Sequence, residues 1–392
     1  MRSTALILCL LSVVLTLKAQ QTNKDNNPLQ KVKLSGYTQV QHQYGEEDEE
    51  SFSRIVIRRG RVKLSFEEKI VSSVFQLDIT EKGVGIKDAY INIKAPFANT
   101  NSLQTGVFNR PFGHEIAYSS SMRESTERSS IFRTLFPEER DLGGMLTLQP
   151  SSESKLNFIK LQAGLFAGNG IKQETDDRLD FIGHLSAAKT YCSNINIGIG
   201  VSYYNGGVYQ GTENIYRMQD GGFAVISDSK NIGKYAKREY IGFDGQLSAS
   251  SAIGKSTLRG EYIFGAQPGT VSSSKSPNSS SLVTADTYIR NFRGGYVTFS
   301  QQLGQLPLSA VFKYDTYDPN TKVSGDNIGL NNTNSADISL NTLGFGMIWE
   351  VMQNVRMQAF YEIVAKEKTE NISAYTNNNK DNVFTLRLQY KF

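Results

Sequence analysis

The sequence predicts an all-β protein: a 16-stranded antiparallel transmembrane β-barrel with a long inward-folded third loop. Apolar and polar residues alternate along many segments that are long enough to cross a bilayer at a tilt. Short and long connections alternate between these segments. No later segment has the roughly 18 consecutive apolar residues of a spanning helix. A chain of strands enters lipid only as a closed barrel, because closure pairs every strand backbone group.

The composition agrees with this class and excludes others. The chain has 392 residues, of which 20% are charged and 10% aromatic, with a mean hydropathy of −0.36. This is too polar for a bundle of membrane helices. Lysine and arginine (42) nearly balance aspartate and glutamate (38), so no general basic surface is available, and nucleic acid is excluded as a partner.

The N-terminus reads as a targeting segment. Arg2 precedes an apolar run over residues 5–17, and Lys18-Ala19-Gln20 follows it, so residues 1–19 are expected to be a Sec signal peptide. Residues 20–30 are expected to be a short periplasmic segment, and 31–392 the barrel domain. Cleavage leaves Cys192 as the remaining cysteine, which excludes an internal disulfide.

Period-2 patterning places the strands, and the last one is the clearest. Phe384, Leu386, Leu388, Tyr390 and Phe392 share one face, whereas Thr385, Arg387, Gln389 and Lys391 share the other. The aromatic end of this strand resembles the signal read by the barrel assembly machinery. The sixteen predicted strands are 31–44, 53–67, 70–80, 86–94, 102–110, 142–150, 155–166, 180–191, 194–206, 237–249, 254–266, 289–302, 306–317, 338–350, 354–366 and 381–392.

The connections favour a barrel over a secreted β-sandwich, which periodicity alone leaves open. Connections after even-numbered strands are short, for example Cys192-Ser193, and most of those after odd-numbered strands are long and polar, for example 207–236. Sorted connections are typical of outer-membrane barrels and predict both termini on the periplasmic side.

The third loop, 111–141, is expected to fold into the lumen and narrow it. Ser121-Met122-Arg123-Glu124 reads as a capping box, with Arg123/Glu127 and Glu124/Arg128 as i,i+4 pairs on a helix running toward Phe132. The alternative is a capped surface loop.

Two groups of basic residues are candidates for the selectivity of a pore. The wall row Arg59, Arg61 and Lys63 alternates with apolar or small residues and should face the lumen, with Glu67 and Asp78 as possible partners. Arg54 and Arg58 break that alternation and are expected near the outer interface. The loop group lies among glutamates and aspartates, with which most of its members should pair; it comprises Arg110, Arg123, Arg128, Arg133 and Arg140.

Several motifs together resemble the phosphate-selective porin O and P family, in its Bacteroidetes-type members. They lie in order within residues 31–150: Ile57-Arg58-Arg59-Gly60-Arg61-Val62, Lys87-Asp88-Ala89-Tyr90-Ile91, Gly106-Val107-Phe108-Asn109-Arg110-Pro111-Phe112-Gly113, Glu127-Arg128-Ser129, Leu135-Phe136-Pro137 and Arg140-Asp141-Leu142-Gly143. The resemblance implies a trimeric porin of a Gram-negative outer membrane whose constriction uses arginines and lysines. The nearly balanced charge and the acidic run 46–50 depart from the strongly basic pore of phosphate-selective members.

The sequence therefore predicts a water-filled channel for small polar solutes, including anions such as phosphate. Its partners are outer-membrane lipid, further copies of the chain and these solutes, with no cofactor, metal or catalytic residue. An enzyme is the first alternative, but neither H-E-x-x-H nor G-x-S-x-G occurs, and Ala249 stands where a phosphate-binding loop ending in Gly254-Lys255-Ser256 needs glycine. A plugged structural or adhesive barrel is the second.

Overall fold

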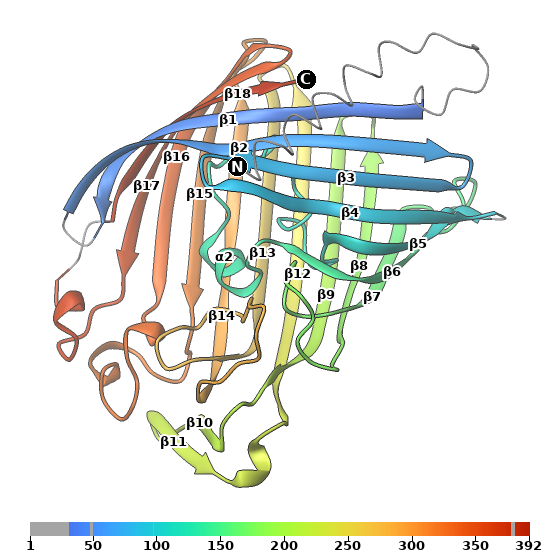
Figure 1. Cartoon of the computed structure of the whole chain (residues 1–392). Coiled ribbons are helices and arrows are strands. Elements are labelled where there is room, and N and C mark those ends of the chain that lie inside the picture. Colours follow the sequence, from blue (N-terminus) through green and yellow to red (C-terminus); the bar gives the residue numbers. More distant parts are fainter. Residues whose placement is uncertain (1–30, 48–49, 97, 378–380) are drawn as a thin grey trace, which may run out of the picture.

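The structure is a computed structural model that describes residues 31–47, 50–96, 98–377 and 381–392. The expected signal peptide and the segment 20–30 lie outside these described residues. Within them, sixteen strands close into one antiparallel barrel (Figure 1). Its strands are β1 (Val32–Glu47), β2 (Glu50–Glu68), β3 (Val71–Thr80), β4 (Gly83–Ala95), β5 (Ala98–Asn109), β6 (Arg140–Leu148), β7 (Ile159–Phe166), β8 (Asp180–Tyr191), β9 (Ile195–Tyr209), β12 (Tyr235–Ser251), β13 (Gly254–Gly269), β14 (Thr287–Gln302), β15 (Leu308–Asp318), β16 (Leu340–Met352), β17 (Val355–Lys366) and β18 (Val383–Lys391).

The sheet closes where the first strand meets the last. β1 pairs with β18 from Tyr37↔Lys391 to Gly45↔Val383, and with β2 on its other edge. β9 pairs directly with β12, so the chain between them forms no part of the wall. The strand count and the predicted barrel are confirmed. The sandwich alternative is wrong, because a sandwich keeps open edges.

The alternation of side chains is that of a barrel with an apolar exterior. On β18, Leu386 and Leu388 are exposed outward, whereas Thr385, Arg387 and Gln389 are buried inward. The same division holds on β9, where Ile199 is exposed and Ser202 is buried. The exposed apolar side chains form the surface that lipid would cover.

Long connections gather at one end of the barrel and short ones at the other (Figure 1). One long connection contains a hairpin that the sequence analysis missed, β10 (Asn214–Gln219) and β11 (Gly222–Ser227). β10 lies beside β14, where Tyr216 stacks on Tyr288 at 4.2 Å. Short 3-10 helices cover Ser229–Asn231, Gly325–Asn327, Ser335–Asp337 and Ser373–Tyr375.

The predicted helix in the third loop is wrong in position and length. The helix α2 covers Ser130–Leu135, with Ser129 as its N-cap, and residues 121–128 are turns and coil. Backbone carbonyls that would accept helical hydrogen bonds accept them from strand side chains instead. The carbonyl of Ser121 accepts from Arg356 and Gln389, that of Glu124 from Gln358, and that of Thr126 from Arg387.

No helix among the described residues is long and apolar enough to cross a membrane.

We predict that Gly106→Ala destabilises the barrel. Gly106 has a φ of 123°, and a Cβ there would lie 2.2 Å from the carbonyl oxygen of Ala89 on β4. The free energy of unfolding should fall by about 1–3 kcal/mol, measured by urea titration of the detergent-folded protein through the fluorescence of Trp349. Gly144→Ala is the control, since its Cβ would meet nothing within 4 Å. An equal loss in both variants would contradict this account.

Candidate functional site

Two β-bulges turn additional cations into the barrel. On β2 the register slips opposite Gln39 and Val40, so that Arg58 is the extra residue beside Arg59. On β4 it slips opposite Gln76 and Leu77, and Lys87 is the extra residue beside Asp88. A bulge puts two residues opposite one and re-aims a side chain. Both Arg58 and Lys87 thereby face the interior.

The expected position of Arg58 near the outer interface is therefore wrong. Arg58 hydrogen-bonds Glu127 of the third loop at 2.6 and 2.5 Å. Arg54 pairs in register with the inward-facing Gln43 and donates to its amide oxygen at 3.1 Å. Glu67 is no lumen partner, because it pairs with Lys94 in an exposed ion pair.

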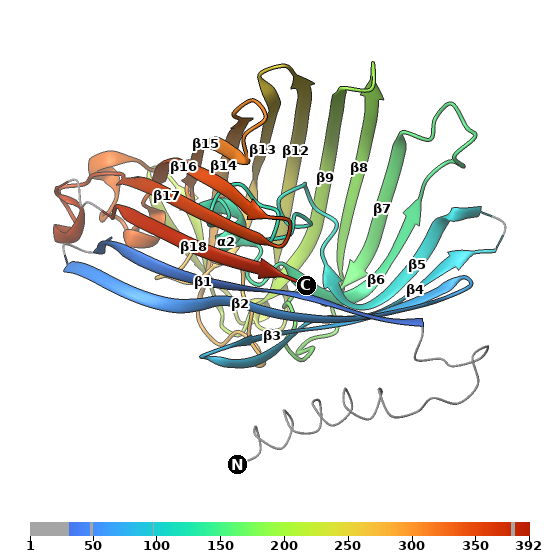
Figure 2. The same ribbon diagram turned by 90° about the horizontal axis from the view of Figure 1, so that it is seen from above.

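The segment 110–139 contacts strands around the whole barrel. Gly113 N donates to Ser202 of β9, His114 N to Glu261 of β13, and Ser130 N to Asp315 of β15. From the opposite walls, Gln39 of β1 and Gln389 of β18 donate to the carbonyls of Ser120 and Ser121. A segment that reaches all these walls of a closed barrel lies within it, and Figure 2 shows α2 inside the ring of strands.

Residues 119–127, here called the strap, leave the rest of this segment and return to it. The guanidinium of Arg128 donates to the carbonyls of Glu115, Ile116 and Tyr118, so the two ends of the strap lie together. Between these ends the strap crosses to β17, β18, β1 and β2. The strap thus spans the seam where the sheet closes.

Glu127 is the main charged contact of the strap. Its carboxylate accepts from Arg58 of β2 and, at 3.0 Å, from Arg387 of β18. Burial alone would raise the pKa of Glu127, but the neighbouring arginines, Arg58 first, hold it well below its usual range. One carboxylate therefore joins two strands that flank β1 to the loop.

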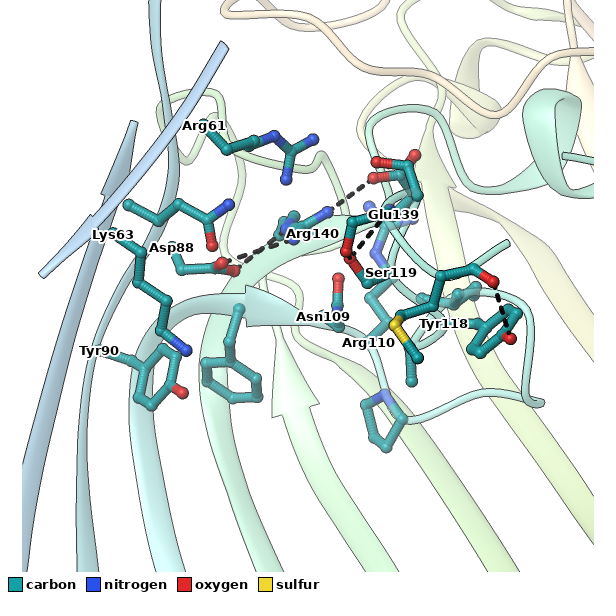
Figure 3. Close-up of a pocket in the computed structure, with 18 of the residues that line it drawn as sticks. Arg61, Lys63, Asp88, Tyr90, Asn109, Arg110, Tyr118, Ser119, Glu139 and Arg140 are labelled. Atoms are coloured by element: carbon teal, nitrogen blue, oxygen red, sulfur yellow. Dashed lines mark hydrogen bonds and ion pairs between the residues drawn. The ribbon is translucent and has the colours of Figure 1, made fainter. Parts of the chain in front are cut away.

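A second chain of charges lies beside the first. Glu139 accepts from Arg128 and, at 2.7 Å, from Arg140, and Arg140 also donates to Asp88 of β4 at 3.1 Å. Burial acts to raise the pKa of Glu139, yet Arg128 and Arg140 lower it overall. The chain fixes the end of the loop to the β4 wall (Figure 3).

The opposite half of the interior holds a large apolar cluster. Phe132, Leu135 and Phe136 of the α2 region pack with side chains of β5, β6, β8, β9, β12, β13, β14 and β15. The cluster comprises Phe108, Phe112, Ile116, Ile131, Phe132, Leu135, Phe136, Met145, Phe166, Ile182, Tyr204, Tyr240, Ile263, Phe292, Tyr296 and Tyr317. The cluster fills most of this half of the barrel, and a second cavity of about 290 Å³ remains beside it, lined by side chains of β7, β8, β9 and β12.

The structure divides the predicted site residues into two sets. Arg61 lies 3.2 Å and Arg59 3.8 Å from Asp78. Lys63 has no carboxylate within ion-pair distance in the described part of the chain, and lines a cavity. The wall row does face the interior, and Asp78 offsets part of its charge.

The loop arginines do not act as one group. Arg110 is buried in an ion pair with Asp141 at 2.9 Å, within the filled half. Arg128 and Arg140 belong to the Glu139 chain. Arg123 is buried with its Nε and Nη2 unpartnered, and Arg133 is exposed on α2. The i,i+4 pairs did not form, because Glu124 pairs with Arg259 and Glu127 with the wall.

Cations outnumber carboxylates where the ion pairs of Glu127 and Glu139 meet the barrel wall. Sequence analysis missed several of them: Arg58 and Lys87, because bulges carry no period-2 signal, and Arg387, although its inward alternation on the last strand was visible. The cations are Arg58, Arg59, Arg61, Lys87, Arg128, Arg140 and Arg387, and the carboxylates Asp78, Asp88, Glu127 and Glu139.

A cavity of about 560 Å³, here called the vestibule, lies between the loop and the wall from β1 to β8 at the short-turn end. Arg61, Lys63, Arg128, Glu139 and Arg140 are among its lining residues (Figure 3). Among the described residues, no cluster of His, Cys, Asp and Glu side chains is arranged to hold a metal ion.

We predict that Glu127→Gln weakens the barrel at neutral pH by about 3 kcal/mol, because it leaves the buried Arg387 and the partly buried Arg58 without their carboxylate. The native pKa of Glu127 is depressed, so its stabilisation is present above the unfolded glutamate value of 4.5 and is lost as pH falls through the native value. The difference in unfolding free energy between parent and variant, measured by urea titration, should therefore start to narrow below about pH 4.5 and vanish only when the pH is below the native pKa.

Glu138→Gln is the matched control. Glu138 lies in the same loop and accepts a hydrogen bond from the Asn278 amide at 3.3 Å, which glutamine can also accept. If Glu138→Gln costs as much stability as Glu127→Gln, the ion pairs of Glu127 are not what holds the strap.

Comparison with known proteins supports the fold. No protein-family model matches the chain, and no curated protein matches it. The motifs quoted above therefore remain the basis of the resemblance to the phosphate-selective porin O and P family.

Solved structures of outer-membrane proteins are similar along nearly the whole chain. OprB of Pseudomonas putida at high pH has a TM-score of 0.60 at 8% identity, over 92% of this chain and 94% of that chain. The trimer form of OmpT, an outer-membrane protein of Vibrio cholerae, has a TM-score of 0.53 at 10% identity, over 92% and 99%. A mutant porin of Rh. blastica has a TM-score of 0.50 at 11% identity, over 92% and 100%. At these identities the likeness is one of fold, and that fold is the barrel of outer-membrane porins.

Proposed function

We propose that this chain is an outer-membrane porin, a channel for passive diffusion of small polar solutes that prefers anions. The observation that carries the proposal is the excess of cations where the vestibule meets the wall of β2 and β4. Unbalanced charge in a narrow cavity with low-dielectric walls focuses its field on passing ions. Rings of charge and the width of the constriction set the preference of a pore.

The proposed path runs along the charged half of the interior. The aromatic cluster fills most of the other half, so solutes would pass between the strap and the β2–β4 wall. Glu127, Glu139 and Asp78 offset part of the positive charge there, which predicts a modest preference. Phosphate is one candidate solute, through the family resemblance.

The remaining parts of the proposal concern the cellular setting. The chain would be exported by its signal peptide, inserted by the barrel assembly machinery with both termini on the periplasmic side, and assembled as a homotrimer. The trimer form of the similar Vibrio cholerae protein and the family resemblance support the last point. Nothing in the proposed activity requires catalysis or a cofactor.

A plugged structural barrel is the second candidate. It is favoured by the aromatic cluster and by the packing of loops at the far end, where Arg290 and Asp337 form a fully buried ion pair. Single-channel recording in planar bilayers separates the two, since a plugged barrel gives no conductance steps.

The wall row should govern ion preference. In a KCl gradient the reversal potential of the parent should indicate anion preference, and the triple variant Arg59→Gln, Arg61→Gln, Lys63→Gln should lose most of it. The preference should fade as salt rises, because the Debye length is about 8 Å at physiological ionic strength. Lys255→Gln, which removes an exposed lysine outside the vestibule, is the control. If the triple variant keeps the parental potential while Arg123→Gln shifts it strongly, the wall row is the wrong choice.

Removing the strap should raise single-channel conductance. Because Arg128 holds the ends of the strap together, residues 119–127 can be replaced by two glycines with the aromatic cluster intact. The deletion removes the backbone and side chains that lie against β17, β18, β1 and β2. Unchanged conductance in a variant that folds, as judged by circular dichroism, would show that the strap does not bound the path.

A further inference from the structure

The vestibule is lined by two chemically different kinds of side chain. Arg61, Lys63 and Arg140 supply positive charge from β2 and β6. Tyr90 of β4 and, from the loop, Ala117 and Met122 supply apolar surface to the same cavity. Figure 3 shows Lys63 above Tyr90, with Arg140 near the middle of the view and Tyr118 on the far side.

Met122 is unusual for the interior of a polar channel. Its side chain is 53% exposed, although its backbone is fixed: Met122 N donates to Ser119 O at 3.0 Å, and Tyr118 Oη donates to Met122 O at 3.0 Å. An apolar side chain that is exposed to water lacks the favourable free energy of burial. A ligand with an apolar part would restore that burial.

Tyr90 packs against the aromatic cluster and also lines the cavity. Its ring packs edge-to-face on Phe108 at 6.0 Å, and Phe108 packs in the same way on Phe166 at 5.6 Å. The ring is therefore held in place, and it is only partly buried. Lys63, beside it, has no ion-pair partner in the described part of the chain. A cation and a fixed aromatic surface thus face the same space.

We infer that the vestibule binds organic anions that join a carboxylate to an aromatic or branched apolar group. The inference rests on the proposed function and names its preferred solute class. The carboxylate would lie at Lys63, and the apolar group would cover Tyr90 and Met122. Inorganic phosphate would pair with the cations but leave Tyr90 and Met122 exposed to water. The volume of about 560 Å³ is within the range of small-molecule sites.

The test is the interruption of chloride current in planar bilayers by four probes. Benzoate has both parts, acetate and inorganic phosphate carry only the charge, and benzamide carries only the ring. Benzoate should halve the current at a concentration about tenfold lower than each of the others, because ring burial adds apolar contact to the shared charge contact. Equal potency of phosphate, acetate or benzamide would overturn the inference.

Variants separate the contribution of the cation from that of the apolar side chains. The double variant Tyr90→Ser, Met122→Ser should weaken benzoate about tenfold and leave acetate unchanged. Lys63→Gln should weaken both anions. Lys255→Gln, an exposed lysine at the same end of the barrel and outside the vestibule, should change neither. Loss of benzoate potency in Lys255→Gln, or none in the double variant, would contradict the assignment.

A direct binding measurement tests the site independently of ion conduction. Benzoate binding to the detergent-folded protein is measured by calorimetry. Benzoate can also partition into the micelles, and titration of the same variants in the same detergent measures that contribution. Binding that the double variant loses, in a protein without conductance, would overturn the channel and support the site. Conductance without benzoate binding would overturn the site alone.

Discussion

The structure depends on satisfying the polar backbone of a loop that lies inside a closed barrel. Buried carbonyls and N–H groups need partners, and a six-residue helix provides few for a segment that runs from Arg110 to Glu139. Inward side chains of the strands supply the rest: Gln358, Arg387 and Gln389 donate to strap carbonyls, and Glu261 accepts from His114 and Glu115. The wall and the loop are thus one hydrogen-bonded unit, and the path left for solutes follows from how they fit.

That fit makes the interior asymmetric. Apolar residues of the loop, Phe132 and Phe136 among them, pack on the β5–β15 side, and its carboxylates Glu127 and Glu139 turn to arginines of the other side. Because these carboxylates are already paired with arginines, they do not neutralise the further cations near β2 and β4. The same contacts that hold the loop therefore create the electropositive surface on which the proposed anion preference rests.

The sequence predicted the wall well, because each barrel strand has one lipid side and one interior side, and period-2 alternation records that difference directly. It predicted the strap wrongly: local spacing favoured i,i+4 pairs for Glu124 and Glu127, whereas Arg259 and Arg58 lie far away in the chain. The inward turn of Arg58 and Lys87 comes from bulges, which shift register without altering composition. The missed hairpin did have a signal, since Asp220-Gly221 is a favoured two-residue turn with positive φ at both positions.

The central claim is that solutes pass along the β2–β4 wall and not through the filled half. It is tested most directly by current block with a water-soluble thiol reagent, in a background where the exposed Cys192 is replaced by serine. Lys63→Cys lies on the proposed path; Thr298→Cys, on the inward face of β14, lies in the opposite half and is buried. The account predicts that the reagent removes most of the current in Lys63→Cys and none in Thr298→Cys. Block in Thr298→Cys with Lys63→Cys unaffected would contradict it.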